Sequence, residues 1–295
     1  MLEFKKPELQ DKAWVAPIMR EANELACEYC FGNLYMWSSV YKNSIARYGN
    51  LFLARDGGER PMYLFPCGNG SKKAAVEELM RCAANDGVPL KMYSLTPKKV
   101  RELETLFPGQ FDYFPMREYF DYIYLSQDLI TLAGRKYHAK RNHLSYFKKT
   151  FQWQYEPLSE KNMDECLSMN DSWEEKNLEK NPEEIGNERI AITRGLDKFF
   201  ELGFTGGVLR VDGQVVAYTF GEPLSDKVFC THVEKAFADM RGGYPAINQM
   251  FAENALSSYK LINREEDTGS EGLRKAKESY YPAVLLPKYR AVYKG

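Results

Sequence analysis

The sequence lacks long hydrophobic runs and carries almost no excess charge of either sign. No stretch of about eighteen apolar residues occurs, so we expect no transmembrane helix. The first twelve residues are charged and hold no apolar core, which argues against a signal peptide and for a cytoplasmic location. The net charge of −1 gives the whole molecule no general attraction to nucleic acid or to a membrane surface.

Cysteine and histidine are also scarce, with 6 and 3 residues. Cys27 and Cys30 form a C-x-x-C pair, but no second cysteine pair occurs at the spacing of a zinc ribbon. His138 and His143 lie far along the sequence from this pair. We therefore expect buried, reduced thiols and no metal site. The P-loop, the dinucleotide-binding glycine pattern and the G-x-S-x-G nucleophile motif are absent as well.

The composition is that of a soluble globular protein of 295 residues, with 44% apolar and 27% charged residues. This length is sufficient for two domains of ordinary size. Aromatic residues make up 14% of the chain, including 20 Tyr and 17 Phe. Such a share indicates large side chains in a core or in a lined groove.

The order of predicted elements occurs twice along the chain. The first half reads as hairpin, helix, strand and helix over 51–55, 61–65, 71–85, 90–95 and 96–106, with an aromatic strand at 119–125. The second half repeats this order over 207–211, 214–220, 228–234, 245–259 and 261–267, followed by a short helix. The pattern predicts an α/β (α+β) protein of two similar units, 1–150 and 151–295, with mixed sheets flanked by helices.

A segment near the C-terminus combines three acids, a glycine turn and a basic helix. If the acids continue the preceding strand, Glu265 and Asp267 lie on one face and Glu266 on the other. Thr268 followed by Glu271 fits a capping box that starts the helix. We expect carboxylates next to cations here, an arrangement that suits the transfer of a polar group.

The helix after this turn has two predicted faces. Its apolar stripe consists of Leu273, Ala276 and Tyr280, and its polar stripe of Arg274, Lys277 and Tyr281. The small residues of the turn, Gly269, Ser270 and Gly272, leave the N–H groups of the first helical turn open to an anion. The alternative interpretation is a capped surface helix whose charges pair with each other.

A basic segment separates the two halves. Residues 134–149 contain six Lys or Arg and no acid, interleaved with aromatic residues. As a helix, they present an apolar stripe of Tyr137, Leu144 and Phe147, and polar stripes that include Lys136, Lys140, Arg141, His143 and Lys148. This concentration of one sign would suit phosphates, from RNA or from a phosphate-bearing cofactor. The alternative is a solvated basic helix that packs on acidic parts of the same chain.

Several of these motifs together resemble a known family. They are Asp121, G-R-K-Y-H-A-K-R-N-H at 134–143, N-R-E-E-D-T-G at 263–269, Leu273-Arg274, Lys277, S-Y-Y-P at 279–282 and F-G-N-L-Y-M-W at 31–37. The set is similar to the phosphatidylglycerol lysyltransferase C-terminal-domain-like family. The resemblance implies two tandem acetyltransferase-like (GNAT) domains. It also implies kinship with Fem-type enzymes, which move amino acids from charged tRNA to peptidoglycan precursors or lipids.

The resemblance implies acyl or aminoacyl transfer to an amine or hydroxyl, with the site in residues 151–295 and a structural or acceptor-binding role for residues 1–150. The candidate catalytic residues are Asp267 and Glu266, which would orient or deprotonate the nucleophile, and Lys277, Arg274 and Tyr280, which would stabilise the oxyanion or protonate the leaving oxygen. The candidate donor-binding residues are Lys136, Lys140, Arg141, Asn142, Arg241 and Gly242. Glu234 and His232 are weaker candidates that would line the pocket.

The donor loop departs from the coenzyme A pattern of single-domain GNAT enzymes. Residues 240–246 retain Arg241 and Gly242, but Tyr244 is bulky where backbone should approach phosphate, and Pro245 removes an N–H donor. Charged tRNA is therefore favoured over acyl coenzyme A as the donor. The lysyltransferases also carry a large membrane-embedded part that this sequence does not show, so a lipid headgroup would be reached only by peripheral contact.

Two other functions remain open at this point. One is a non-catalytic tandem module that binds tRNA or another polyanion through residues 135–149. The other is a coenzyme A-dependent N-acetyltransferase that acts on a small amine. The acceptor in the transfer reaction could be a small molecule, a peptide or a lipid headgroup. Because two units in one chain supply the pairing that many acetyltransferases obtain by dimerising, we expect a monomer.

Overall fold

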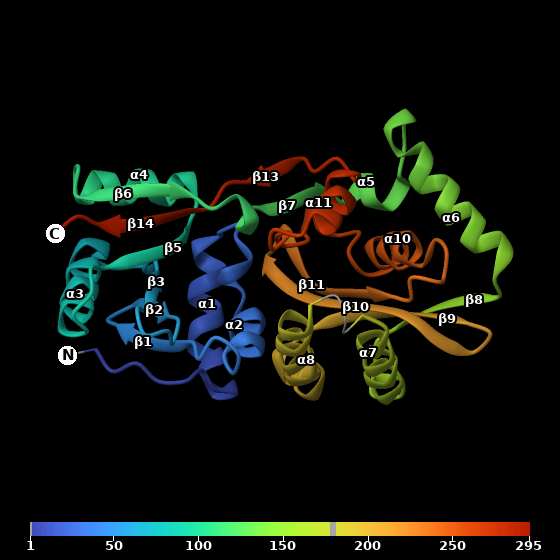
Figure 1. Cartoon of the computed structure of the whole chain (residues 1–295), viewed down its shortest axis with the longest axis horizontal. Helices are drawn as coiled ribbons and strands as arrows, with labels where there is room; N and C mark the ends of the chain where they lie inside the picture. Colours follow the sequence, from blue (N-terminus) through green and yellow to red (C-terminus); the bar gives the residue numbers. More distant parts are fainter. Residues whose placement is uncertain (1, 178–180) are drawn as a thin grey trace.

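Two mixed β-sheets form the frame of the protein in the computed structural model, which describes residues 2–177 and 181–295 (Figure 1). The first sheet contains β1 (Ser44–Tyr48), β2 (Leu51–Arg55), β3 (Met62–Leu64), β4 (Cys67–Gly68), β5 (Lys91–Leu95), β6 (Phe111–Pro115) and β14 (Tyr289–Tyr293). The second contains β7 (Asp121–Leu125), β8 (Trp153–Pro157), β9 (Thr205–Val211), β10 (Gln214–Ser225), β11 (Val228–Ala236), β12 (Leu261–Asn263) and β13 (Val284–Leu286). Their orders are β1-β2-β3-β5-β14-β6, with β4 beside β2, and β13-β7-β12-β11-β10-β9-β8.

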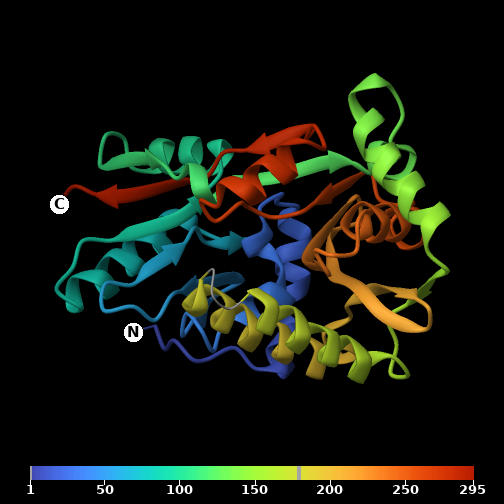
Figure 2. The ribbon, with the colours of Figure 1, turned by 45° about the vertical axis from the view of Figure 1, so that its right-hand side comes forward.

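Helices cover both sheets and fill the space between them. They are α1 (Lys12–Ala22), α2 (Phe31–Trp37), α3 (Lys72–Asn85), α4 (Pro97–Leu106), α5 (Ser126–Thr131), α6 (His138–Thr150), α7 (Met163–Asn177), α8 (Pro182–Asp197), α9 (Phe199–Leu202), α10 (Gly243–Ala255) and α11 (Glu271–Glu278). Figures 1 and 2 show α1 and α2 between the two sheets, where their apolar residues join a core that both sheets share. In the second unit, α10 lies on one face of the sheet, and α7 and α8 lie on the other.

Each sheet is built around the same strand–helix–strand unit. Among the described residues, the first sheet has one parallel pair, β3 with β5, connected through α3. The second sheet likewise has one, β11 with β12, connected through α10. A parallel pair requires a crossover of this kind, whereas an antiparallel pair can be joined by a tight turn, as β9 and β10 are. This repetition confirms the predicted tandem α/β architecture with mixed sheets.

The two units exchange one strand each. β7 follows β6 in the sequence but pairs with β12 and β13 of the second sheet. β14 follows β13 but inserts between β5 and β6 of the first sheet. The sheets therefore do not divide at residue 150: residues 121–125 lie in the second sheet and 289–293 in the first. The sequence pattern identifies a strand but does not specify which sheet edge it will pair with, so the predicted boundary misses this exchange.

A buried ion pair lies where the two exchanged strands begin. Lys288 precedes β14 and Asp121 opens β7; their side chains are 1% and 0% exposed, and Nζ lies 2.7 Å from Oδ1. Lys288 also contacts Glu28 at 2.8 Å, and Asp121 accepts hydrogen bonds from the Cys27 backbone and the Asn263 side chain, both at 2.9 Å. These contacts form a buried polar cluster that joins the segment between α1 and α2, both exchanged strands and the end of β12.

The local predictions hold for most elements but fail after β12. The hydroxyl of Ser71 accepts a hydrogen bond from the backbone of Ala74 and caps α3 as expected. The strand expected over 261–267 ends at Asn263, because β12 diverges from β11 there; Glu265 and Thr268 then adopt positive φ. As a result, the three acids do not alternate across a sheet.

The helix that follows also differs from the prediction. Ser270, not Thr268, caps α11 by accepting a hydrogen bond from the backbone of Leu273. Of the expected apolar stripe, Leu273 and Ala276 are exposed and Tyr280 is buried, and Lys277 of the expected polar stripe is buried as well. Among the described residues, no helix combines the length and apolar character needed to cross a bilayer.

Replacing Lys288 with Met tests how much the buried ion pair of Lys288 and Asp121 contributes to stability. The variant leaves Asp121 and Glu28 without their buried cation, which should lower the free energy of unfolding by about 3–5 kcal/mol. The control is Lys294→Met, because Lys294 is 45% exposed and pairs with Asp112 at the surface, so its loss should cost only about 0–1 kcal/mol. Urea unfolding of both variants measures the difference; equal stabilities would contradict this role for Lys288.

Candidate functional site

The candidate site lies where β11 and β12 separate. The two strands pair only over Val228–Cys230 and Leu261–Asn263, and then diverge. A β-bulge follows in β11, because Phe220 pairs with Val233 whereas Gly221 pairs with Thr231. The extra residue, His232, breaks the alternation of the strand. His232 consequently contacts Phe204 and Glu222 on the α2 side of the sheet, whereas Glu234 contacts Asn248 of α10 on the other side.

On the α10 side, Glu234 and Arg264 form the ion pair that we call the Glu234–Arg264 site. Glu234 Oε1 lies 2.7 Å from Arg264 Nη2, and both side chains are largely buried. Asn248 donates to the second oxygen of Glu234 at 2.8 Å. The guanidinium lies over the rings of Tyr280 and Tyr124, at 4.9 and 5.5 Å from the centroids. The aromatic rings limit the access of water, which strengthens the electrostatic interactions between the enclosed charges.

Two buried polar atoms of this site have no hydrogen-bond partner among the described residues. They are Arg264 Nη1, a donor, and Asn248 Oδ1, an acceptor. Leaving such a group unpaired in the interior costs about 1–3 kcal/mol. Native proteins retain few such groups, and those that remain often mark places where a ligand or water binds. A donor and an acceptor beside one carboxylate define a polar ligand site.

Lys140 of α6 completes the Glu234–Arg264 site. Its Nζ lies 4.0 Å from the centroid of Tyr280, on the ring that also contacts Arg264. Burial and the nearby charge of Arg264 lower the pKa of Lys140 to about 8, although Glu234 opposes the shift. Near neutral pH, the amine can therefore both release and accept a proton, as a general acid–base catalyst requires.

On the α2 side, a second group of side chains surrounds His232; we call it the His232 cluster. The imidazole is 1% exposed and contacts Glu265 Oε1 through Nδ1 at 2.7 Å and Glu222 Oε1 through Nε2 at 3.1 Å. Burial alone would lower the pKa of His232, but Cys230 and the two carboxylates raise it well above its usual value. Asn33, from the F-G-N-L-Y-M-W motif, donates to Glu265 at 2.8 Å.

Asp267, a predicted catalytic residue, is surrounded by donors. Its carboxylate is fully buried and contacts Arg117, Arg274 and Tyr122 at 2.7–2.9 Å, and it also accepts from the backbone of Gly269. Burial would raise its pKa, but these hydrogen bonds, led by Arg274 and Tyr122, hold the pKa of Asp267 well below its usual value. Of the N–H groups in this turn, the carboxylate of Asp267 accepts from that of Gly269, and its pairing with Arg274 favours a structural role for both residues.

The other predicted catalytic residues lie at separate places. Lys277 is buried and donates to the backbone carbonyls of Arg264 and Glu266, so it fixes the turn that carries the acids. Glu266 points toward Cys27, with Oε2 3.5 Å from Sγ; burial raises the pKa of Glu266 to about 7, with Lys288 opposing and Glu265 adding to the shift. Tyr280 is the predicted residue that lines the Glu234–Arg264 site.

The predicted donor-binding residues also lie at separate places in the structure. Lys140 lies in the Glu234–Arg264 site, whereas Lys136 pairs with Asp128, Asn142 contacts His138, and Arg241 lies over the ring of Tyr146 at 4.3 Å. Arg141 donates to the carbonyls of Leu132 and Gly134 and so holds the start of α6. α6 lies at the edge of the molecule (Figure 1), and Arg135 just before it and Lys148 and Lys149 near its end are exposed.

The loop that matches the coenzyme A pattern is closed by α6. Gly242 adopts φ of +88°, and a Cβ there would lie 2.5 Å from the carbonyl oxygen of His143. Glycine is therefore required for the approach of α6 to α10, a role unrelated to pyrophosphate. α6 thus packs on the start of α10, where Gly243 is buried and Tyr244 and Pro245 are half-buried.

The fold is a tandem arrangement of two α/β units with mixed sheets, and comparison with known sequences assigns the family. The profile described as phosphatidylglycerol lysyltransferase, C-terminal, matches residues 19–292, so the chain belongs to this family. A conserved protein of unknown function from Bacteroides thetaiotaomicron is 38% identical over all of both chains, with a TM-score of 0.95.

More distant structures share the fold. L-PGS from Bacillus licheniformis is 15% identical over 99% of this chain and 93% of its own, with a TM-score of 0.69. FemX is 8% identical over 98% and 96%, with a TM-score of 0.62. A curated relative from Mycoplasmoides gallisepticum, described as an uncharacterized protein, is 25% identical over 186 residues, and the match spans about half of its length.

Asp267→Asn tests the structural role of this carboxylate. Removing the buried charge breaks the ion pairs with Arg274 and with Arg117, which keeps Glu278, and should cost about 3 kcal/mol at pH 7. Because the folded pKa of Asp267 is depressed, its contribution is complete above the unfolded pKa of about 3.9 and is lost as pH falls below that value. The stability gap between the wild type and the variant should therefore narrow from about pH 5 toward pH 2 in urea unfolding. A gap that is independent of pH would contradict the role.

Proposed function

We propose that this protein transfers an aminoacyl group from charged tRNA to an amine or hydroxyl at the Glu234–Arg264 site. The observation that carries the proposal is the pair of unpartnered buried atoms, Arg264 Nη1 and Asn248 Oδ1, beside Glu234. The membership in a family described by a lysyltransferase supports the reaction class. The structural similarity to L-PGS and FemX supports the fold that would carry out this reaction.

The chemistry of the site matches an aminoacyl ester better than a simple acyl group. An aminoacyl ester carries a cationic α-ammonium, which the Glu234 carboxylate and the Asn248 carbonyl would accept. Its carbonyl oxygen becomes negative when the nucleophile attacks, and Arg264 Nη1 is the free donor available to stabilise it. An acetyl group has no ammonium and would leave Asn248 Oδ1 unpaired.

Lys140 is the proposed proton carrier. The acceptor nitrogen or oxygen forms a bond to the carbonyl carbon, and the ester bond to the ribose oxygen breaks. The proton of the acceptor passes to neutral Lys140 Nζ, which then gives it to the leaving oxygen. A pKa of about 8 suits both steps.

The donor is proposed to be held by α6. Exposed cations before and along this helix, Arg135, Lys148 and Lys149, would follow the phosphates of an RNA strand. Lys140 lies on the same helix with its amine in the site, so the RNA surface and the reaction centre belong to one element. The closed loop at Gly242 favours tRNA over coenzyme A.

Lys140→Met should slow transfer by about 10²- to 10⁴-fold, the usual effect of removing a general acid–base group. The assay follows radiolabelled aminoacyl groups from bulk charged tRNA to small amines, peptides or phosphatidylglycerol vesicles. The wild-type rate should rise with pH through about 8, because Lys140 must be neutral to accept the first proton. The variant should lack that rise.

Lys149→Met is the matched control, since Lys149 is an exposed lysine of the same helix. It should keep the rise with pH and lose at most some affinity for tRNA. A Lys140→Met protein that transfers at the wild-type rate would refute the role of Lys140. A wild type that binds tRNA but forms no product would favour the non-catalytic module instead.

A further inference from the structure

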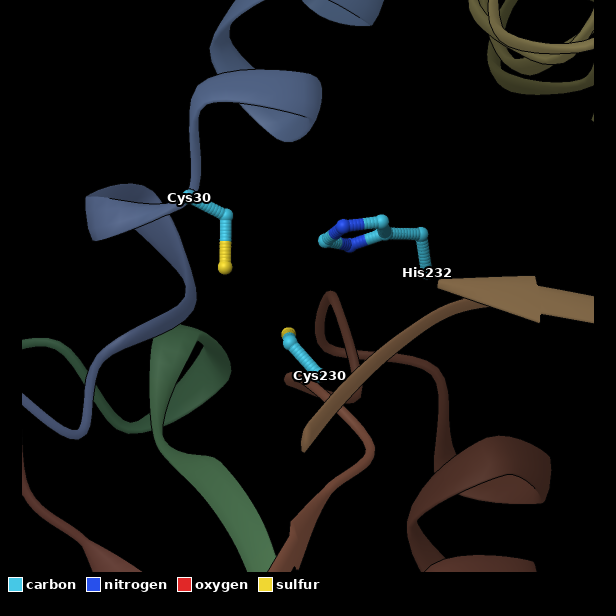
Figure 3. A group of neighbouring side chains, drawn as sticks. All are labelled: Cys30, Cys230 and His232. Atoms are coloured by element: carbon cyan, nitrogen blue, oxygen red, sulfur yellow. The ribbon is translucent and has the colours of Figure 1, made fainter. Parts of the chain in front are cut away.

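The His232 cluster brings together four metal-ligating side chains from distant segments. Cys30 comes from the turn before α2, Cys230 and His232 come from β11, and Glu265 comes from the turn after β12. Figure 3 shows the two thiols and the imidazole pointing toward one another. The three labelled residues offer ligand atoms that all lie within 4.8 Å of one another, and both thiols are buried.

The distances are close to those of a tetrahedral zinc site. With Zn–S of about 2.3 Å and Zn–N or Zn–O of about 2.0–2.1 Å, the ligand atoms stand about 3.3–3.8 Å apart. Cys230 Sγ and Glu265 Oε1 are 3.7 Å apart, and Glu265 Oε1 lies 2.7 Å from His232 Nδ1. An ion would replace that short hydrogen bond and separate its two atoms by about half an ångström.

The side chains around these ligands also suit a metal. His232 Nε2 contacts Glu222 at 3.1 Å, so Nδ1 is left to ligate while a carboxylate orients the ring. This carboxylate–histidine arrangement is common next to protein-bound zinc. Asn33 donates to Glu265 Oε1 at 2.8 Å and fixes the fourth candidate ligand. The set of two sulfurs, one nitrogen and one oxygen fits zinc better than magnesium or calcium, which prefer oxygen alone.

A second acidic thiol cluster in the same molecule provides a contrast. Cys27, Glu28 and Asp121 are also close enough to hold an ion. There, however, the ammonium of Lys288 contacts all three side chains at 2.7–3.4 Å and supplies the positive charge. The His232 cluster has no lysine or arginine in an ion pair with Glu222 or Glu265 among the described residues.

We propose that Cys30, Cys230, His232 and Glu265 bind a structural zinc ion. The thiols and the imidazole would ligate in their deprotonated forms and release their protons on binding. The four ligands fill a tetrahedral shell and the cluster is buried, so the ion would have no open position for substrate. It would tie the segment before α2 to the diverging strands β11 and β12 and so hold the turn that carries Arg264.

Zinc content of the purified full chain tests this proposal. The protein is loaded with zinc, freed of excess ion by desalting and measured by plasma mass spectrometry. We expect about one zinc per chain for the wild type and for Cys166→Ser, a matched control that removes one buried thiol elsewhere. Cys230→Ser should retain less than about a tenth of that amount, since a shell that has lost a thiolate binds zinc much more weakly.

Cobalt gives a second test that does not depend on a variant folding. Wild-type protein loaded with Co²⁺ should show thiolate-to-cobalt charge-transfer absorption with the intensity of a tetrahedral site. A wild type that holds no zinc after loading, or whose cobalt form lacks this absorption, overturns the proposal. Zinc that is lost in Cys27→Ser but kept in Cys230→Ser also overturns it, because the ion would then lie in the Lys288 cluster.

Discussion

The buried pair of Lys288 and Asp121 is the interaction on which the arrangement of the two units depends. It lies where β7 leaves the first unit and β14 leaves the second, so each strand of the exchange begins at one member of the pair. Charges buried at 0–1% exposure tolerate little displacement, because the attraction that offsets their desolvation falls off with separation. The pair therefore fixes the position of one sheet relative to the other.

The buried cluster around Lys288 and Asp121 also positions the candidate site. Asn263 at the end of β12 donates to Asp121, and the chain then turns through Arg264, Glu265 and Glu266. Arg264 reaches Glu234 on the α10 side of the sheet, whereas Glu265 reaches His232 on the α2 side. The buried ion pair, the short parallel pairing of β11 with β12 and the β-bulge in β11 thus place two polar centres on opposite faces of one sheet. We propose that the transfer reaction takes place at the first centre and that the second binds zinc.

The sequence predicts the family and many of the elements. Hydrophobic periodicity and capping residues such as Ser71 are local signals, and they predict many strands and helices, including the basic helix α6, but not α1, β1 or β14. The strand exchange and the bulge at His232 depend on pairing between distant segments, which periodicity does not encode. For the same reason, strand alternation does not predict the positions of the acids after β12. In the structure, Asp267 instead pairs with Arg117 and Arg274. Lys140, Glu234 and Tyr280 were named from the sequence, but their meeting with Asn248 and Arg264 was not predicted.

We propose that the Glu234–Arg264 site recognises the aminoacyl end of a tRNA held by α6. The most direct measurement compares retention of charged and uncharged tRNA on the wild type and on Glu234→Gln, at low and moderate salt. We expect the wild type to prefer charged tRNA, and the variant to lose this preference while its binding of both forms remains equally sensitive to salt. Equal retention of charged and uncharged tRNA by the wild type would refute recognition of the aminoacyl group at this site.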